Sequence, residues 1–219
     1  MTDLHEVYEN VAKVWNRDYN IHISPGYMMG YKQSDWALLD NLPLQEMKAL
    51  NIGASYPIDA INIGWKFKQF YETDFTKEIV DKMRSTFEKV YPKTFYSNIY
   101  FEVVDATKIL FEDNFFDIVI AYSSLDHIPE HDKAIDEMCR VSKKYVCITL
   151  PNLLDEFNAN YSKEHPERFG YEKYWSIPKL LHKMMKQGFI PIKYNNNEGH
   201  ISGNRFGYLF ERYPGGIEN

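Results

Sequence analysis

The chain has 219 residues, a length that suits one α/β domain with a short additional segment. Hydrophobic residues make up 44% of the sequence and charged residues 26%, which supplies a full core and excludes disordered and fibrous proteins. The net charge of −6 disfavours proteins that bind the phosphate backbone, so we expect no nucleic-acid partner.

The first residues form neither the basic nor the apolar region of a secretory signal, and no apolar run approaches the roughly 20 residues of a membrane span. The two cysteines, Cys139 and Cys147, form no CxxC pair, so neither a disulfide framework nor a zinc site is expected. These features predict a cytoplasmic protein that does not bind a membrane.

Residues 1–45 are predicted to form a helical leader in front of the main domain, residues 46–219. Apolar side chains recur at helical spacing in residues 3–16, and residues 34–39 predict a short helix that ends before Pro43. Four aromatic side chains of the leader could form a lid over the active site: Trp15, Tyr19, Tyr27 and Tyr31. Packing of the leader against the sheet explains these side chains equally well.

From residue 47 onward, segments typical of buried strands alternate with helical segments. The predicted strands are residues 47–53, 68–74, 100–105, 116–122 and 145–150. A helical segment follows the first strand, and amphipathic helices are predicted at residues 77–89 and 131–141. Such alternation indicates βαβ units and therefore a parallel sheet with right-handed crossovers.

The end of the chain breaks this alternation. A helix at residues 177–187 precedes strands at 189–194 and 205–211, and only the turn-rich residues 195–204 separate the two strands. Two strands joined without a helix should be antiparallel. The expected fold is α/β: a Rossmann-like, seven-stranded, mostly parallel sheet with helices on both faces and an antiparallel C-terminal hairpin.

The residues after the strand ends outline a ligand site, because open parallel sheets bind ligands at the carboxyl ends of their strands. Gly53 and its small neighbours allow the backbone to come close to a ligand after the first strand. Asp74 ends the second strand, where a carboxylate can accept hydrogen bonds from two ribose hydroxyls. Asp105 follows the third strand and can contact an adenine amine. Together these residues predict an adenosine-containing ligand.

Several longer segments carry a family pattern. They are Phe-Glu-Asp-Asn-Phe-Phe-Asp-Ile-Val at 111–119, Leu-Asp-His-Ile-Pro-Glu at 125–130, residues 134–141, Ile-Thr-Leu-Pro-Asn at 148–152 and Lys-Gln-Gly-Phe at 186–189. With them the sequence resembles the class I S-adenosylmethionine-dependent methyltransferases, in particular the small-molecule enzymes called methyltransferase domain 11 or 25. The resemblance covers most of the chain after residue 45 and is strongest between residues 49 and 152.

The resemblance implies the class I methyltransferase fold, S-adenosylmethionine as cofactor, and methyl transfer to a small molecule in a biosynthetic pathway, with a hydroxyl as the favoured acceptor. The predicted cofactor-binding residues are Asn51, Gly53, Ala54, Ser55, Asp74, Phe75, Asp105, Ala106 and Tyr122. The sequence does not identify the acceptor molecule, its accepting atom or the oligomeric state.

The first loop departs from the family pattern acid-x-Gly-x-Gly-x-Gly. Its positions hold Asn51, Gly53, Ser55 and Pro57, so only the first glycine is present. The departure predicts a weakened cofactor site or a shifted methionine moiety, and it supports an alternative function: a non-catalytic or repurposed protein that acts as a binding or partner subunit. A nicotinamide oxidoreductase would need Gly-x-Gly-x-x-Gly, which residues 53–58 do not supply.

Methyl transfer from a sulfonium is an in-line displacement, so the enzyme aligns the reactants and removes a proton when the acceptor is a hydroxyl. His127 follows the fourth strand and is the candidate base, with a structural role as the other interpretation. The candidate acceptor-binding residues are Tyr27, Tyr31, His165 and Arg168, with His200 as a further candidate. No metal is expected, because metal assistance would need clustered acids and an Asn after strands five and six.

Overall fold

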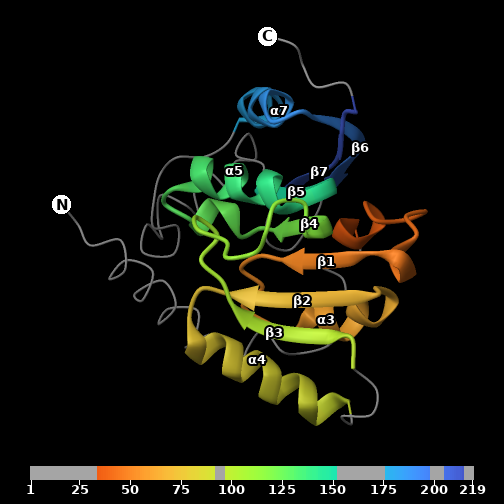
Figure 1. Ribbon diagram of the computed structural model, residues 1–219, viewed down its shortest axis with the longest axis vertical. Coiled ribbons are helices and arrows are strands. Elements are labelled where there is room, and N and C mark those ends of the chain that lie inside the picture. The colour runs from red at the N-terminus through yellow and green to blue at the C-terminus, as the bar shows by residue number, and fades with distance from the viewer. Residues whose placement is uncertain (1–33, 92–96, 152–175, 198–204, 215–219) are drawn as a thin grey trace, which may run out of the picture.

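A computed structural model of the chain describes residues 34–91, 97–151, 176–197 and 205–214 (Figure 1). Its strands are β1 Lys48–Asn51, β2 Gln69–Asp74, β3 Ile99–Val103, β4 Phe116–Tyr122, β5 Ser142–Pro151, β6 Phe189–Asn197 and β7 Arg205–Arg212. They form one sheet in the order β3-β2-β1-β4-β5-β7-β6. Strands β1 to β5 pair in parallel, and β7 runs antiparallel to β5 and β6. This is the mostly parallel sheet with an antiparallel hairpin that the sequence predicted.

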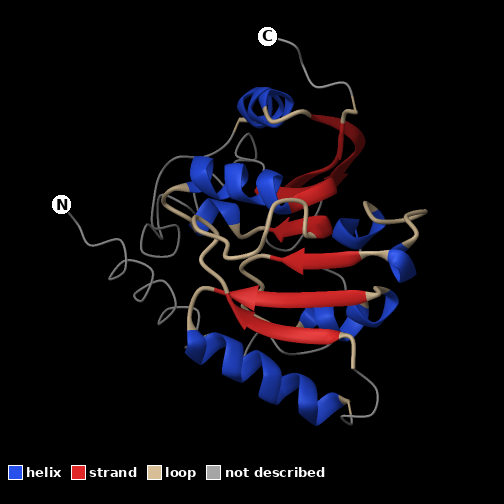
Figure 2. Cartoon of the chain, in the orientation of Figure 1, coloured by secondary structure: helices blue, strands red, loops and turns tan. Residues whose placement is uncertain are grey.

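Helices cover both faces of the sheet, and side-chain caps mark the start of two of them. The helices are α3 Ile58–Asn62, α4 Lys77–Val90, α5 His131–Val141 and α7 Ile177–Lys186. The Thr76 side chain accepts a hydrogen bond from the Ile79 N–H at the start of α4, and Ser176 caps α7 through the Lys179 N–H. Figure 2 shows these helices around the central layer of strands.

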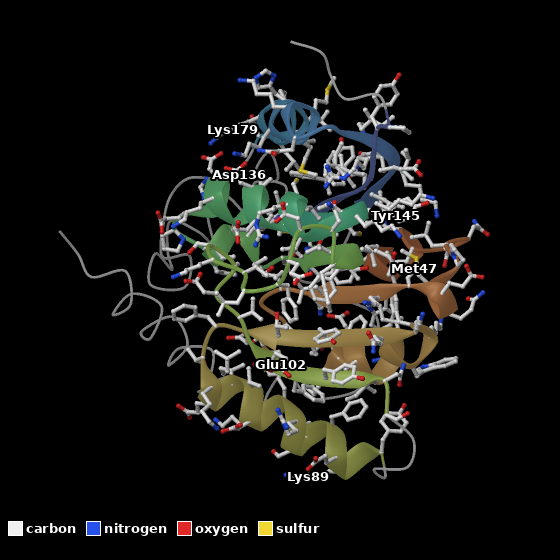
Figure 3. The ribbon with its side chains drawn as sticks, in the orientation of Figure 1. Met47, Lys89, Glu102, Asp136, Tyr145 and Lys179 are labelled. Carbon is white, nitrogen blue, oxygen red and sulfur yellow. The ribbon has the colours of Figure 1, made fainter. Side chains whose placement is uncertain are left out.

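The hydrophobic core has two parts, one on each face of the sheet, and side chains fill the space between strands and helices (Figure 3). Strand β4 contributes to both, because successive side chains of a strand point to opposite faces. Its Ile118 and Ile120 pack with α3 and α4, whereas Val119 and Ala121 pack with α5 and α7. This double burial explains why residues 118–121 of β4 form a continuous apolar run.

The structure refines the predicted element bounds. The first strand ends at Asn51 rather than at Gly53, because Gly53 has a φ of +65° and turns the chain out of the sheet. Strand β5 begins at Ser142, directly after α5, and is longer than predicted. The helical segment after β1 is only the five residues of α3, followed by the 3₁₀ turn Gly64–Lys66.

The described part of the leader begins at residue 34. Residues 34–37 are helical, within the short helix that the sequence predicted, whereas the predicted helix at residues 3–16 lies outside the described residues. Leu38 and Leu39 are buried and belong to the core on the α3 and α4 face. Within the described parts of the chain, no helix is long and apolar enough to cross a membrane.

Candidate cofactor and active site

The carboxyl ends of β1, β2 and β4 lie at one edge of the sheet, because these strands are adjacent and parallel. Asn51, Asp74 and Tyr122 are their last residues. Between β1 and β4 the direction in which the chain adds strands to the sheet reverses. Strands β2 and β3 lie on one side of β1, whereas β4 and β5 lie on its other side. Ligands of open parallel sheets bind at such a switch point. The loops that follow β1, β2 and β4 therefore form the candidate site.

Gly53 lies where the first loop passes close to the loop after β4. A Cβ atom at this position would come within 2.6 Å of Ser124 Cβ, and the φ of +65° is one that side-chain-bearing residues rarely adopt. Both facts require glycine here. The backbone of the first loop thus contacts a side chain of the loop after β4 at the switch point. This contact requires a glycine at position 53, which is the only motif glycine that the sequence keeps.

The rest of the first loop keeps a left-handed turn without a second glycine. Ser55 has a φ of +58°, a conformation that costs a residue other than glycine roughly 1–2 kcal/mol. Two hydrogen bonds hold the loop to the end of β2: Ala54 N–H donates to Thr73 O at 2.8 Å, and Ser55 N–H donates to Asp74 Oδ2 at 3.1 Å. The altered motif therefore folds into a defined loop.

Asp74 is the carboxylate around which this loop closes. Besides the Ser55 N–H, its carboxylate accepts a hydrogen bond from the Thr76 N–H at 3.4 Å. Burial raises the pKa of Asp74 to about 6, although these backbone donors oppose the shift. A partly buried carboxylate gains from further hydroxyl donors, as a ribose would provide.

Asp105 lies two residues beyond β3 and is held in a fixed orientation. Its Oδ1 accepts hydrogen bonds from the Thr107 N–H and the Thr107 hydroxyl, both at 2.8 Å. This turn closes the loop after β3, and Ala106 between the two residues is buried. The orientation of the Asp105 carboxyl is therefore set before any ligand arrives.

Tyr122 ends β4, but its side chain belongs to the core. The ring is buried on the α3 and α4 face, with its hydroxyl next to the Cys147 thiol. Burial, together with Cys147, raises the pKa of Tyr122 well above its usual value, so the phenol does not titrate near neutral pH. Phe75, by contrast, is half-buried at the strand edge, next to Asp74.

His127 lies in the 3₁₀ turn Leu125–His127 that follows β4. Its Nε2 is 3.4 Å from Oδ2 of Asp126, and 17% of the His127 side chain is exposed against 5% of Asp126. The other carboxylate oxygen, Asp126 Oδ1, is buried without a hydrogen-bond partner among the described residues, as are the hydroxyls of Ser123 and Ser124. Residues 123–126 thus carry three buried polar atoms without a hydrogen-bond partner in the described part of the chain.

Asn51 lies in a buried polar network that the sequence analysis missed. Its amide Nδ2 donates to Glu72 Oε2 at 2.8 Å and to Asp59 Oδ2 at 3.1 Å. Trp36 Nε1 donates to Asp59 Oδ1 at 2.7 Å, and the Ala60 N–H donates to Glu72 Oε1 at 3.3 Å. One signal was available: Glu72 is a charged residue at a buried position of a strand.

A family described as a methyltransferase domain matches residues 61–212 of the chain. The chain belongs to this methyltransferase family. The match covers more than half of the sequence and includes all the strands from β2 to β7. No curated protein matches the chain by sequence.

Solved structures share the fold of this methyltransferase at low sequence identity. Magnesium protoporphyrin IX methyltransferase from Synechocystis, solved with bound S-adenosylhomocysteine, is 15% identical, with a TM-score of 0.73 over 96% of this chain and 100% of that one. The YcgJ protein from Bacillus subtilis is 17% identical, with a TM-score of 0.67 over 84% and 100%. The [4+2]-cyclase SpnF is 13% identical, with a TM-score of 0.64 over 84% and 82%.

The methyltransferase is therefore a class I enzyme that depends on S-adenosylmethionine, as the sequence predicted. Its described residues fit this cofactor. Gly53 turns the first loop out of β1 at the switch point, and the Asp74 carboxylate holds the same loop through the Ser55 N–H. Asn51 Oδ1 and Ser124 Oγ are buried there as acceptors without a hydrogen-bond partner among the described residues. No group of three or more potential metal ligands is found among the residues that the structure describes.

The predicted acceptor-binding residues of the methyltransferase lie outside the described residues. They are Tyr27, Tyr31, His165 and Arg168, and the same holds for Trp15, Tyr19 and His200. The structure brings the loops with Asn51, Gly53, Ser55 and Asp74 to one edge of the sheet, and it places His127 in the loop that Gly53 contacts through Ser124.

Proposed function

We propose that this methyltransferase transfers a methyl group to a hydroxyl oxygen of a small molecule. The observation that carries the proposal is the Asp126–His127 pair, which follows closely after Ser124, the residue in contact with Gly53. Hydroxyl acceptors have to lose a proton around the transition state, and imidazole is the side chain suited to accept it near neutral pH. Of the other described histidines, His131 is buried at the start of α5 and His182 is exposed on α7.

The cofactor would be held by residues from three strand ends. Gly53 and Ser55 would present their backbone to it, Asp74 would accept hydrogen bonds from its ribose, and Asp105 would contact its adenine. The same loops contain Ala54, Phe75 and Ala106, which would lie next to the cofactor. Tyr122 would contribute its backbone at the end of β4. When bound, S-adenosylmethionine supplies a methyl group that its sulfonium already activates, so no residue of the chain is needed to activate it.

The Asp126–His127 pair would then accept the proton that the hydroxyl acceptor loses. Asp126 Oδ2 faces His127 Nε2, so a proton on Nε2 is favoured and the other ring nitrogen becomes the basic one. The low exposure of both side chains keeps this pair in an environment with little water, where the carboxylate acts more strongly on the ring. In this role His127 is the base, and Asp126 orients it and stabilises the imidazolium.

The leader, residues 1–45, is proposed to form part of the lid. Its described end is held to the main domain by two contacts. Trp36 Nε1 donates a hydrogen bond to Asp59 Oδ1 of α3, and Arg205 Nη1, at the start of β7, lies 4.0 Å from Asp35 Oδ2. These contacts hold the end of the leader near the carboxyl ends of β1 and β5. We propose that the preceding residues cover the site and that Tyr27 and Tyr31 contact the acceptor, together with His165 and Arg168.

Methyl transfer from labelled S-adenosylmethionine tests the proposal directly. We expect transfer to phenols and alcohols in a panel of matched small molecules that differ only in the acceptor group: hydroxyl, amine or thiol. Transfer only to amines or thiols would contradict hydroxyl methylation. Calorimetric titration with S-adenosylhomocysteine tests the cofactor site separately, and an absence of binding at millimolar ligand would contradict that site.

A further inference from the structure

Three polar side chains are buried together beneath the first loop. Asn51 and Glu72 are direct neighbours across β1 and β2, and Asp59 comes from the first turn of α3. Asn51 is 1% exposed, and Glu72 and Asp59 are fully buried. The Asn51 amide nitrogen joins the two carboxylates, at 2.8 Å from Glu72 and 3.1 Å from Asp59. This group is unusual, because buried carboxylates are costly unless they receive hydrogen bonds.

The two carboxylates fix the orientation of the Asn51 amide. Carboxylates accept hydrogen bonds, so the amide must turn its NH₂ group toward Glu72 and Asp59. Its oxygen, Oδ1, is then on the opposite side of the amide group, and it is buried without a hydrogen-bond partner in the described part of the chain. A buried acceptor without a partner is uncommon in proteins, and a donor group of a ligand would satisfy it.

The position and the charge of this group identify the donor. Asn51 is the last residue of β1 and lies two residues before Gly53, at the edge where the cofactor is proposed to bind. Two carboxylates behind the amide favour a positively charged donor over a neutral one. The amino-acid end of S-adenosylmethionine carries such a donor, its ammonium group.

We propose that Glu72 is a positioning residue for the cofactor: with Asp59 it holds the Asn51 amide so that Oδ1 accepts a hydrogen bond from the cofactor's ammonium group. The proposal rests on the cofactor site proposed above. The family pattern has an acid at position 51, whereas this chain has its carboxylate on β2, as Glu72. The Asn51 amide would connect this carboxylate to the ligand. An aspartate at position 51 would face two carboxylates, which explains why this chain has asparagine there.

The test compares two ligands that differ in the amino-acid moiety. S-adenosylhomocysteine has the ammonium group, whereas 5′-methylthioadenosine lacks the whole amino-acid end. In Glu72→Gln the side-chain amide of Asn51 can flip, which exchanges the positions of its oxygen and nitrogen. We therefore expect the variant to bind S-adenosylhomocysteine about tenfold or more weakly than the wild type. The affinity for 5′-methylthioadenosine should change less than about twofold. Glu78→Gln, an exposed substitution on α4, is the matched control and should change neither affinity.

A residue swap provides the second arm. Asn51→Asp alone places three carboxylates together and should lose S-adenosylhomocysteine. The triple variant Asn51→Asp, Asp59→Asn, Glu72→Gln reverses every donor and acceptor between these side chains, and the amide oxygens introduced at positions 59 and 72 can still accept from Trp36 and Ala60. It should fold and bind S-adenosylhomocysteine within about threefold of the wild type. This variant decides the question if Glu72→Gln alone does not fold.

The outcomes separate the two proposals. Equal losses for both ligands in Glu72→Gln, or a folded triple variant that no longer prefers S-adenosylhomocysteine to 5′-methylthioadenosine, would overturn the positioning role of Glu72. A wild-type protein that binds neither ligand would instead overturn the cofactor site. Selective loss in Glu72→Gln with recovery in the triple variant would support the proposal.

Discussion

Gly53 and Ser124 are in contact across the switch point of the sheet, so closely that a Cβ on Gly53 would lie 2.6 Å from the Cβ of Ser124. The contact joins the loop after β1 to the loop after β4. The first of these loops is proposed to hold the cofactor, and the second carries the Asp126–His127 pair. The close approach of the Gly53 backbone to the Ser124 side chain thus helps to set the spacing between the cofactor residues and the candidate base.

Gly53→Ala should therefore destabilise the protein for two reasons, the clash with Ser124 and the positive φ. We expect a loss of roughly 2–4 kcal/mol in the free energy of unfolding, together with weaker S-adenosylhomocysteine binding. Gly188→Ala is the matched control, because Gly188 has a φ of +78° but no atom within 4 Å of the added Cβ. It should cost about 1–2 kcal/mol. Equal losses of stability in urea unfolding would contradict the importance of the Ser124 contact.

Ser55→Gly should stabilise the protein, because it removes the strain of a φ of +58° from the first loop. We expect a gain of about 0.5–1 kcal/mol in urea unfolding, since the greater freedom of glycine in the unfolded chain offsets part of the relief. Asn114→Gly, also at a φ of +58°, should gain less, because asparagine tolerates this conformation better than serine. A destabilised Ser55→Gly protein would show that the serine side chain has a role of its own.

Asp74 should make cofactor binding depend on pH. Its pKa of about 6 means that it is partly protonated in mildly acidic solution, and the ionised carboxylate accepts hydrogen bonds from ribose hydroxyls more strongly than the protonated acid does. The affinity for S-adenosylhomocysteine should therefore rise from pH 5 to about pH 7 and level off above that. Asp74→Asn should bind weakly and lose this pH dependence. Calorimetry across the pH range measures both effects, and a pH-independent wild type would contradict the assignment.

The same group should affect stability in the opposite direction. The pKa of Asp74 is higher in the folded than in the unfolded protein, so the folded state binds more protons between about pH 4 and pH 6. Its contribution to stability is complete below pH 4 and is lost as the pH rises through 6. Ligand-free Asp74→Asn should therefore be more stable than the wild type at pH 7, by on the order of 1–2 kcal/mol. Equal thermal unfolding of the two proteins at pH 7 would argue against a burial-shifted carboxyl.

Local patterns predicted much of this fold, and the reason is visible in particular elements. Strand β4 and helix α5 begin and end at the residues that the sequence predicted, 116–122 and 131–141. Both are strongly patterned, one by a continuous apolar run and the other by a single buried face. The short α3 was harder to predict, because its five residues are too few to show a helical periodicity.

The candidate site shows the limit of such patterns. Asn51, read from the sequence alone, indicates a motif that has lost its acid. The parallel register of β1 and β2 places Glu72 beside it, and α3 brings Asp59 to the same amide. These contacts join residues that are 8 and 21 positions apart, and no local spacing rule predicts them. The positions of the strand-end residues could be predicted, but their partners could not.

His127→Ala tests the proposed chemistry. If His127 accepts the proton of a hydroxyl acceptor, turnover should fall by roughly 10²–10⁴-fold, while the affinity for S-adenosylhomocysteine stays nearly unchanged. Asp126→Asn should cause a smaller loss, because it weakens the orientation of the ring but keeps the base. His182→Ala, on the exposed side of α7, is the control. Unchanged turnover in His127→Ala would show that this histidine is structural and that alignment of the reactants alone drives the transfer.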